Sequence, residues 1–425
     1  MATHLILRLV LALLIFISPT PSRAFHDPEP TPSVTPPPVS PSPPAQKLTP
    51  DQQITRIDSS GKTVFAIGDL HGDFRAAVRT LWGVGAINEK YEWVGKHIIV
   101  VQLGDLIDRG KEDMEILNLL RRLEKEAPKY GSQLIVLNGN HEFINVAGDL
   151  KDAHLESLPL FTKHLEQIPN YLKQSYNWSD VQVAEELKTL SRYWETELQS
   201  TLSLLDEKSV PNLLTAPSAL IRSFFELYYP HHNYPTTLTY DLKKALIKKL
   251  KHRAILFSRG FPIARKFAQR HPFVVVGDTV FVHGGLLPEH LEYGLDKIEA
   301  ETQAWLTDRS IETPDRLQLY GPAAFQAPWW TRELILDPNQ SKQCERLSTV
   351  LKALKVRRMV VGHTVTPSTS IENSCHAQLL RIDVALSGAF WPQYGNIRPK
   401  PYETLKIGPT KDGHTPAYII STPVF

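Results

Sequence analysis

Cysteine is scarce: the 425-residue chain contains only Cys344 and Cys375, which leaves room for one disulfide at most. Pairing depends on how far apart the two Cβ atoms lie, and the sequence does not give that separation. A disulfide formed in an oxidising compartment and two unrelated buried thiols are both compatible with these two residues.

The chain also lacks an excess of charge of either sign. Its formal net charge is +2, and residues 1–24 contribute two cations, Arg8 and Arg23, and no acid, so the remainder is close to neutral. A nucleic-acid-binding surface needs a concentrated basic face, so we expect no nucleic-acid partner. The apolar and charged fractions are those of an ordinary soluble globular protein.

The apolar run near the N-terminus, from Leu9 to Ile17, is too short for a membrane span, which needs about 20 residues. Arg8 precedes it, and Ser22-Arg23-Ala24 places small residues where signal peptidase cleaves. We therefore predict a signal peptide over residues 1–24, entry into the secretory pathway or secretion, and no stable membrane span after cleavage. An uncleaved anchor or an organelle transit peptide is the alternative. In the secretory pathway, two tripeptides would accept glycans: Asn177-Trp178-Ser179 and Asn339-Gln340-Ser341.

Proline dominates the next segment, since ten of the residues from Asp27 to Pro50 are Pro. Each Pro fixes φ and lacks an amide donor, so this stretch forms neither a helix nor a central strand. We predict a disordered, extended linker over residues 25–60 and a folded domain over residues 61–425.

The folded domain begins with strands that alternate with helices. Three apolar runs, 63–67, 97–103 and 133–137, are predicted strands, and the stretches 73–82 and 111–126 between them have helical patterns. Further strands are predicted at 273–276, 279–282, 357–361, 379–383, 402–407 and 417–421, with a helix at 293–306. Apolar strands separated by helices indicate an α/β fold whose sheet is covered on its faces.

Residues from about 148 to 259 interrupt this order and have mainly helical patterns, so we predict a helical insertion. Within it, His231-His232 lies in a loop rich in Tyr and Pro. Metal ligands come in spaced clusters, so this pair is better explained as solvated or packed.

Five polar clusters stand at strand ends, where α/β sheets place their ligand sites. They are Gly68-Asp69-Leu70-His71-Gly72-Asp73, Gly104-Asp105-Leu106-Ile107-Asp108-Arg109-Gly110, Gly139-Asn140-His141-Glu142, His283-Gly284-Gly285 and Gly362-His363. So many ionisable groups in one crevice need cations to neutralise them. Oxygen and imidazole donors without a thiolate suit Mn, Fe or Zn.

The order of these motifs resembles that of the PPP-type metallophosphatases in the calcineurin-like phosphoesterase superfamily. The resemblance covers residues from about 64 to 421 apart from the insertion. The signal or transit segment, the helical insertion and Trp329-Trp330-Thr331-Arg332 are similar to the bacterial-like, or Shewanella-like, branch. This resemblance implies a four-layer α-β-β-α sandwich and a phosphatase that uses two metal ions. The chain has no segment like the Ser-Ala-Pro-Asn-Tyr-Cys of the eukaryotic core enzymes, so the choice between Ser/Thr and Tyr phosphate stays open.

The resemblance also implies roles for individual residues. The metal ligands would be Asp69, His71, Asp105, Asn140, His283 and His363, with Asp105 bridging two divalent or trivalent ions, and a metal-bound hydroxide would attack phosphorus. His141, oriented by Asp108, would protonate the leaving oxygen. Arg109 and Arg332 would clamp the phosphate oxygens. Glu142 would contact the metal-binding residues without binding a metal ion itself. Asp383 either orients a ligand or forms an ordinary strand-end turn.

The expected function is hydrolysis of phosphate monoesters on a phosphoprotein or phosphopeptide. Two alternatives remain. A dinucleoside polyphosphate or another small phosphoester would be the substrate if the insertion closes a deep pocket. A catalytically inactive module tethered by the Pro-rich stem would need neither the His141–Asp108 pair nor the two arginines.

Overall fold

A computed structural model describes residues 49–203, 240–311, 326–336, 340–390, 401–409 and 416–422. The chain divides into Met1–Thr49 and Pro50–Phe425, so the predicted signal peptide and most of the predicted linker lie outside the described residues. The 3-10 turn η1 (Pro50–Gln52) and strand β1 (Arg56–Ile57), which pairs with β5, belong to the second unit. Folded structure therefore begins before residue 60, the predicted end of the linker. The sequence analysis missed these two elements because they are too short to give an apolar pattern.

Five strands make the first sheet, in the order β11-β10-β2-β3-β4. Strands β2 (Thr63–Ile67), β3 (Ile98–Gln102) and β4 (Gln133–Val136) run parallel, while β10 (Tyr402–Ile407) is antiparallel to both β2 and β11 (Ala417–Thr422). Since parallel strands end at one edge of a sheet, the motifs that follow β2, β3 and β4 lie together.

Six strands make the second sheet, in the order β1-β5-β6-β7-β9-β8. The hairpin of β5 (Phe273–Val276) and β6 (Thr279–Val282) was predicted at these residues, and β6 runs parallel to β7 (Arg358–Val361). Parallel β6 and β7 bring the His-Gly-Gly and Gly-His motifs to one edge. Strands β9 (Leu379–Arg381) and β8 (Glu372–Ser374) complete the sheet.

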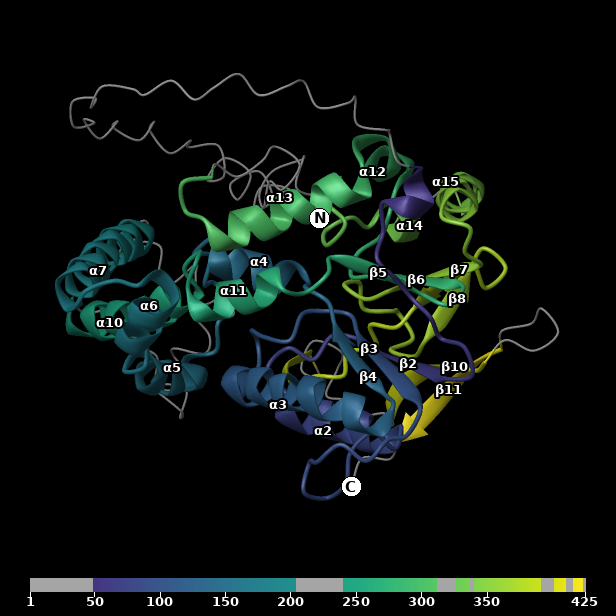
Figure 1. Cartoon of the computed structure of the whole chain (residues 1–425), viewed down its shortest axis with the longest axis horizontal. Coiled ribbons are helices and arrows are strands. Elements are labelled where there is room, and N and C mark those ends of the chain that lie inside the picture. Colours follow the sequence, from purple (N-terminus) through teal and green to yellow (C-terminus); the bar gives the residue numbers. More distant parts are fainter. Residues whose placement is uncertain are drawn as a thin grey trace, which may run out of the picture. The chain divides into compact units, whose positions relative to one another are not determined.

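The two sheets pack face to face, as the alternation of side chains along the strands shows. Val64 and Ala66 of β2 belong to the same buried cluster as Val274 and Val276 of β5, between the sheets. Their neighbours Phe65 and Ile67 face the other way, into a cluster that contains helix residues. Both faces of each sheet are thus covered, which confirms the predicted four-layer sandwich (Figure 1).

The outer layers are helices that follow the strands in sequence. Helix α2 packs against β10 and β11, and α3 against β4. The helices outside the insertion are α2 (Phe74–Gly83), α3 (Asp113–Glu126), α4 (Asn140–Val146), α11 (Pro262–Ala268), α12 (Pro288–Tyr293), α13 (Leu295–Thr307), α14 (Glu333–Leu336) and α15 (Gln340–Ala353), with the 3-10 turn η2 (Ala127–Tyr130) after α3. The predicted helix 293–306 corresponds to α13, and Gly294 separates it from α12, which the sequence analysis missed.

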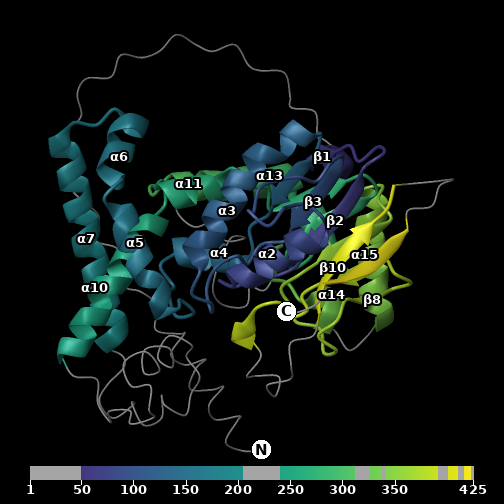
Figure 2. The same ribbon diagram turned by 90° about the horizontal axis from the view of Figure 1, so that it is seen from below.

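The predicted helical insertion contains the 3-10 turn η3 (Leu155–Ser157), α5 (Leu158–Leu165), α6 (Ile168–Tyr176), α7 (Asp180–Ser203) and α10 (Tyr240–Phe257). These helices form a group of their own beside the sandwich, with α10 packed on α5 and α7 (Figure 2). His231-His232 lies outside the described residues. Within the described ranges, no helix is both long and apolar enough to span a membrane.

Cys344 and Cys375 form a disulfide across a sequence separation of 31 residues, with their Cα atoms 5.3 Å apart. The bond ties α15 to the turn between β8 and β9, so it fastens a helix to an edge of the six-stranded sheet. Of the two states that the sequence allowed for these residues, the structure has the paired one.

Candidate active site

The loops after β2 and β3 are joined by backbone hydrogen bonds. The amides of Leu70 and His71 donate to the carbonyl oxygen of Asp105, at 3.0 and 2.9 Å. Gly72 and Gly110, which end the two motifs, lie so close that a Cβ on either residue would come within 2.6 Å of the other's backbone. Glycine is therefore required at both positions for the two loops to meet.

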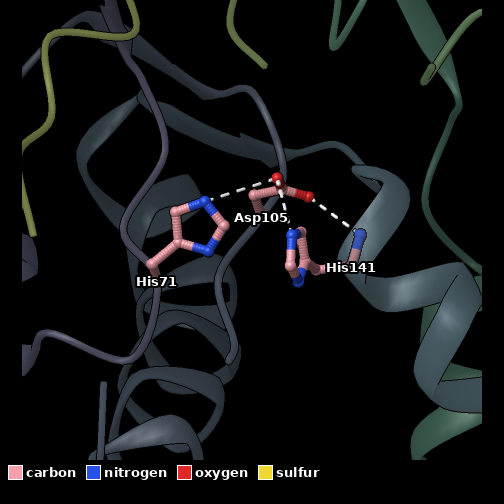
Figure 3. Close-up of side chains that lie close together, drawn as sticks. All are labelled: His71, Asp105 and His141. Carbon is pink, nitrogen blue, oxygen red and sulfur yellow. Dashed lines mark hydrogen bonds and ion pairs between the residues drawn. The ribbon is translucent and has the colours of Figure 1, made fainter. Parts of the chain in front are cut away.

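Asp105 lies at the centre of the site. Its Oδ2 atom is 3.5 Å from Nε2 of His71, 3.9 Å from Nε2 of His141 and 3.2 Å from Nε2 of His283. Figure 3 shows His71 and His141 pointing toward this carboxylate from different segments. Its Oδ1 atom accepts from the amide of His141, the second residue of α4, at 3.0 Å. All four side chains are buried.

The other predicted ligands lie around the same centre. Nε2 of His283 is 3.1 Å from Oδ1 of Asn140, and the amide of His363 donates to Oδ2 of Asp69 at 3.1 Å. Asp69 Oδ1 is 4.0 Å from Nδ1 of His283. The structure therefore brings together all six predicted metal ligands. Two overlapping groups have ligand atoms within 4.8 Å of one another: His71, Asp105 and His141, and Asp105, His283 and His363.

The electrostatics of this cluster fit metal ions. Burial raises the pKa of the Asp69 carboxyl well above its usual value, and the nearby carboxylate of Asp383 adds to this effect. Burial alone would lower the pKa of His283, but the carboxylates of Asp105 and Asp69 outweigh it and raise the pKa to about 9. Buried carboxylates and imidazoles without thiolates are the donors that borderline and hard cations prefer.

Several site residues adopt the left-handed backbone region, which non-glycine residues seldom enter. Asp105, Asp108, Arg109 and His363 have φ values of 53°, 71°, 65° and 65°. Each such residue costs on the order of 1–3 kcal/mol and needs support from its surroundings. Glu142 supplies part of that support, since its carboxylate accepts from the amides of Asp105 at 2.8 Å, Leu106 at 2.9 Å and Gly139 at 2.7 Å.

His141 and Asp108 form the predicted pair. Nδ1 of His141 donates to Oδ2 of Asp108 at 2.7 Å, and the side-chain Nδ2 of Asn145 also donates to this oxygen at 2.7 Å. Burial would raise the pKa of Asp108, but Arg253 and His141 outweigh it and lower the value. The carboxylate therefore stays ionised and holds the imidazole in one orientation, which leaves Nε2 of His141 facing Asp105.

Arg253 is a site residue that the sequence analysis missed. It lies on α10, in the insertion, and its side chain is fully buried. Its Nη2 atom donates to Oδ1 of Asp108 at 2.7 Å, Nη1 donates to Asp113, and Nε donates to Asn145 at 2.8 Å. No motif or spacing connects this arginine to the clusters at the strand ends, so only the fold reveals the contact.

The two predicted phosphate-binding arginines lie near the cluster of predicted metal ligands. Nη1 of Arg109 is 3.4 Å from Nε2 of His71, and its guanidinium lies 4.7 Å above the ring of Phe390. Arg332 is half-buried. Burial lowers its pKa, although the nearby carboxylates of Asp105 and Asp69 act to raise it. Phe390, which the sequence analysis did not select, covers Arg109 and also packs edge-on against His71.

Backbone contacts place the segment before Arg332. The carbonyl oxygen of Pro328 accepts from the amides of Gly284 and Gly285, each at 2.9 Å. Nε2 of His363 donates to the carbonyl oxygen of Trp330 at 3.1 Å. The tandem-Trp segment is therefore fastened to both histidine motifs of the six-stranded sheet.

Asp383 lies at the end of β9, where its carbonyl oxygen accepts from the amide of Thr366 at 2.9 Å. Its carboxylate accepts from the amide of Ala385 at 3.2 Å, as in a strand-end turn. Burial raises the pKa of this carboxyl to about 6, with a further contribution from Asp105. The contact with Ala385 is that of a strand-end turn, and Asp383 acts on Asp69 and Asp105 through its charge.

Comparison with known proteins agrees with this geometry. Residues 62–195 match the calcineurin-like phosphoesterase family. Shewanella-like protein phosphatase 2 of Arabidopsis thaliana is 30% identical over 339 residues, which cover 78% of this chain and 73% of that protein. Shewanella-like protein phosphatase 1 of Plasmodium berghei is 37% identical over 346 residues, 81% of this chain and 71% of that protein.

A solved structure of the cold-active protein-tyrosine phosphatase of a psychrophilic Shewanella species has a related fold. It is 17% identical, with a TM-score of 0.50 over 89% of this chain and 87% of that one. Another structure of a cold-active protein tyrosine phosphatase gives a TM-score of 0.52 at 19% identity over 88% of this chain and 83% of that one. With the sequence matches and the buried donor cluster, these findings identify the chain as a metal-dependent phosphatase that belongs to the Shewanella-like branch of the calcineurin-like phosphoesterases.

Proposed function

We propose that this phosphatase removes phosphate from phosphoproteins, on serine, threonine or tyrosine. The observation that carries the proposal is the convergence, in one buried cluster, of the six predicted metal ligands, the His141–Asp108 pair and two arginines. The names of the two relatives, both protein phosphatases, support a phosphoprotein as the substrate.

The donor set is sufficient for two cations. We propose that Asp69 and His71 hold one ion, that Asn140, His283 and His363 hold the other, and that Asp105 bridges them. Manganese, iron and zinc all suit these oxygen and imidazole donors. When bound, such ions neutralise phosphate charge and acidify a water molecule for attack on phosphorus.

The chain's own residues bind the substrate and move the proton. Arg109 and Arg332 would hold the phosphate oxygens, since a guanidinium can donate two parallel hydrogen bonds to one phosphate. The contact of Arg109 with Phe390 restricts its side chain and orients those donors. His141 would donate its Nε2 proton to the leaving oxygen, while Asp108 keeps the ring aligned through Nδ1.

The first test is a substrate panel. Peptides with phosphoserine, phosphothreonine or phosphotyrosine and a dinucleoside polyphosphate would be compared by phosphate release with Mn, Fe or Zn. We expect kcat/KM for at least one phosphopeptide to exceed that for the dinucleotide by about tenfold or more, which corresponds to about 1.4 kcal/mol of transition-state binding. A dinucleotide preferred over every peptide would contradict the proposal.

A matched pair of substitutions separates proton transfer from metal binding. His141→Ala should lower kcat by at least ~100-fold, because it removes the general acid, and should retain two metal ions per chain. Asp105→Asn should instead lose metal, because it removes the carboxylate shared by both ions. Elemental analysis beside kinetics checks both. Wild-type turnover in His141→Ala, or two metal ions in Asp105→Asn, would remove the role assigned to that residue.

Removal of Arg253 should destabilise the protein. Arg253→Met leaves Asp108 and Asp113 buried without their cation, and breaking a buried ion pair in this way costs about 3–5 kcal/mol. Urea unfolding followed by tryptophan fluorescence would measure the loss. The control is the double variant Arg253→Met with Asp113→Asn, which removes one uncompensated charge and should recover part of the stability. If Arg253→Met were as stable as the wild type, the ion pairs of Arg253 with Asp108 and Asp113 would not hold the insertion in place.

We also propose that the protein enters the secretory pathway by cleavage of residues 1–24. The Cys344–Cys375 disulfide supports an oxidising compartment, and Asn177 is an exposed acceptor for glycosylation. The native protein should begin near Phe25 and lose mass on enzymatic deglycosylation, as N-terminal sequencing and mass spectrometry would measure. A native chain that retains Met1 would overturn the proposal.

A further inference from the structure

A second cavity lies away from the catalytic crevice, where the insertion meets the sandwich. Its volume is about 250 Å³. Five helices line it: α3, α6, α10 and α11 contribute apolar side chains that include Leu117, Ile168, Leu256, Ile263 and Phe267, and α5 contributes His164. Drug-sized ligands occupy about 300–1,000 Å³, so this cavity suits a slightly smaller molecule with an apolar body.

One wall of the cavity carries a buried cation without a hydrogen-bond partner. Arg270 is only 4% exposed, and among the described residues its Nε and Nη1 atoms have no acceptor. Its guanidinium lies over the ring of Phe267, 5.1 Å from the centroid, so aromatic packing holds it in place. An unsatisfied buried guanidinium is costly, because it has lost its water and gained no acceptor in exchange.

The other charged groups around the cavity leave this site positive. Lys266 is paired with Glu124 at 3.0 Å, so these two charges offset each other. His164 and Arg121 also line the cavity, and Arg121 is exposed at the surface. Arg270 has only longer-range attraction, from Glu124 and Glu142. The charged side chains that line the cavity are thus basic, and this lining matches a small molecule with one negative charge at one end.

We propose that this cavity binds a small organic carboxylate, with the carboxylate accepting hydrogen bonds from Arg270 and the apolar body lying between Leu117, Ile168 and Leu256. A charge-assisted hydrogen bond is roughly twice as strong as a neutral one. The apolar body would bury against side chains that already form the cavity, while Nε and Nη1 of Arg270, which have almost no accessible surface, would turn toward the ligand.

Calorimetric titration of the metal-loaded protein with hexanoate tests the proposal, with hexanamide as the neutral analogue. We expect hexanoate to bind and hexanamide to bind at least ~10-fold more weakly, because the amide lacks the charge that pairs with Arg270. Arg270→Met should weaken hexanoate binding by a similar factor. Ile263→Trp, which fills the cavity and keeps Arg270, should weaken it as well, so the test remains if Arg270→Met does not fold.

Asp105→Asn is the control for the catalytic crevice, and it should bind hexanoate with wild-type affinity. Asp105→Asn is expected to lack metal, so loss of hexanoate binding in this variant would mean that hexanoate binds the metal ions of the wild-type protein. That result would overturn the proposal, whether or not the assignment of phosphatase residues holds. Equal affinity for hexanoate and hexanamide, unchanged binding in Ile263→Trp, or no binding of hexanoate at all would each overturn it too.

Discussion

The organisation of this protein depends on the burial of carboxylates and imidazoles around Asp105. His71, His141 and His283 approach one of its oxygens to within 3.9 Å, and each comes from a different segment of the chain. Such a cluster is unfavourable without compensating charge, because burial removes the water that would otherwise solvate it. The fold therefore has to hold these groups in place against their own electrostatics until cations neutralise them.

The backbone around the cluster shows how that is done. The loops after β2 and β3 enter the left-handed region at non-glycine residues and are joined by hydrogen bonds between their backbones. Glu142 accepts from three amides of these loops, and two facing glycines let them meet. Rigid strands place the loops, and the hydrogen bonds fix their conformation, so the site is formed before a substrate arrives.

Most of this arrangement could be predicted from the sequence because the relevant signals are local. Strands β2, β5, β6 and β10 were predicted at their observed bounds, since short β-rich apolar runs end there at turn residues. The motifs at the strand ends could be found for the same reason. Strands β1 and β8 were missed because two or three residues cannot show a period. The state of Cys344 and Cys375 depended on a distance in space, which no local pattern contains.

Arg253 and Arg270 show more clearly what the sequence could not predict, because both are buried cations outside every motif. In the sequence each is one basic residue among several on or beside a helix, and a solvent-exposed position is the ordinary expectation. Their burial follows only from how α10 and α11 dock against the sandwich. Arg253 then compensates the charge of Asp108 and Asp113, so part of the electrostatic balance behind His141 comes from the insertion. The insertion is therefore part of the catalytic domain's electrostatic balance: without α10, Asp108 of the proton-transfer pair and the neighbouring Asp113 would both lack their counter-charge.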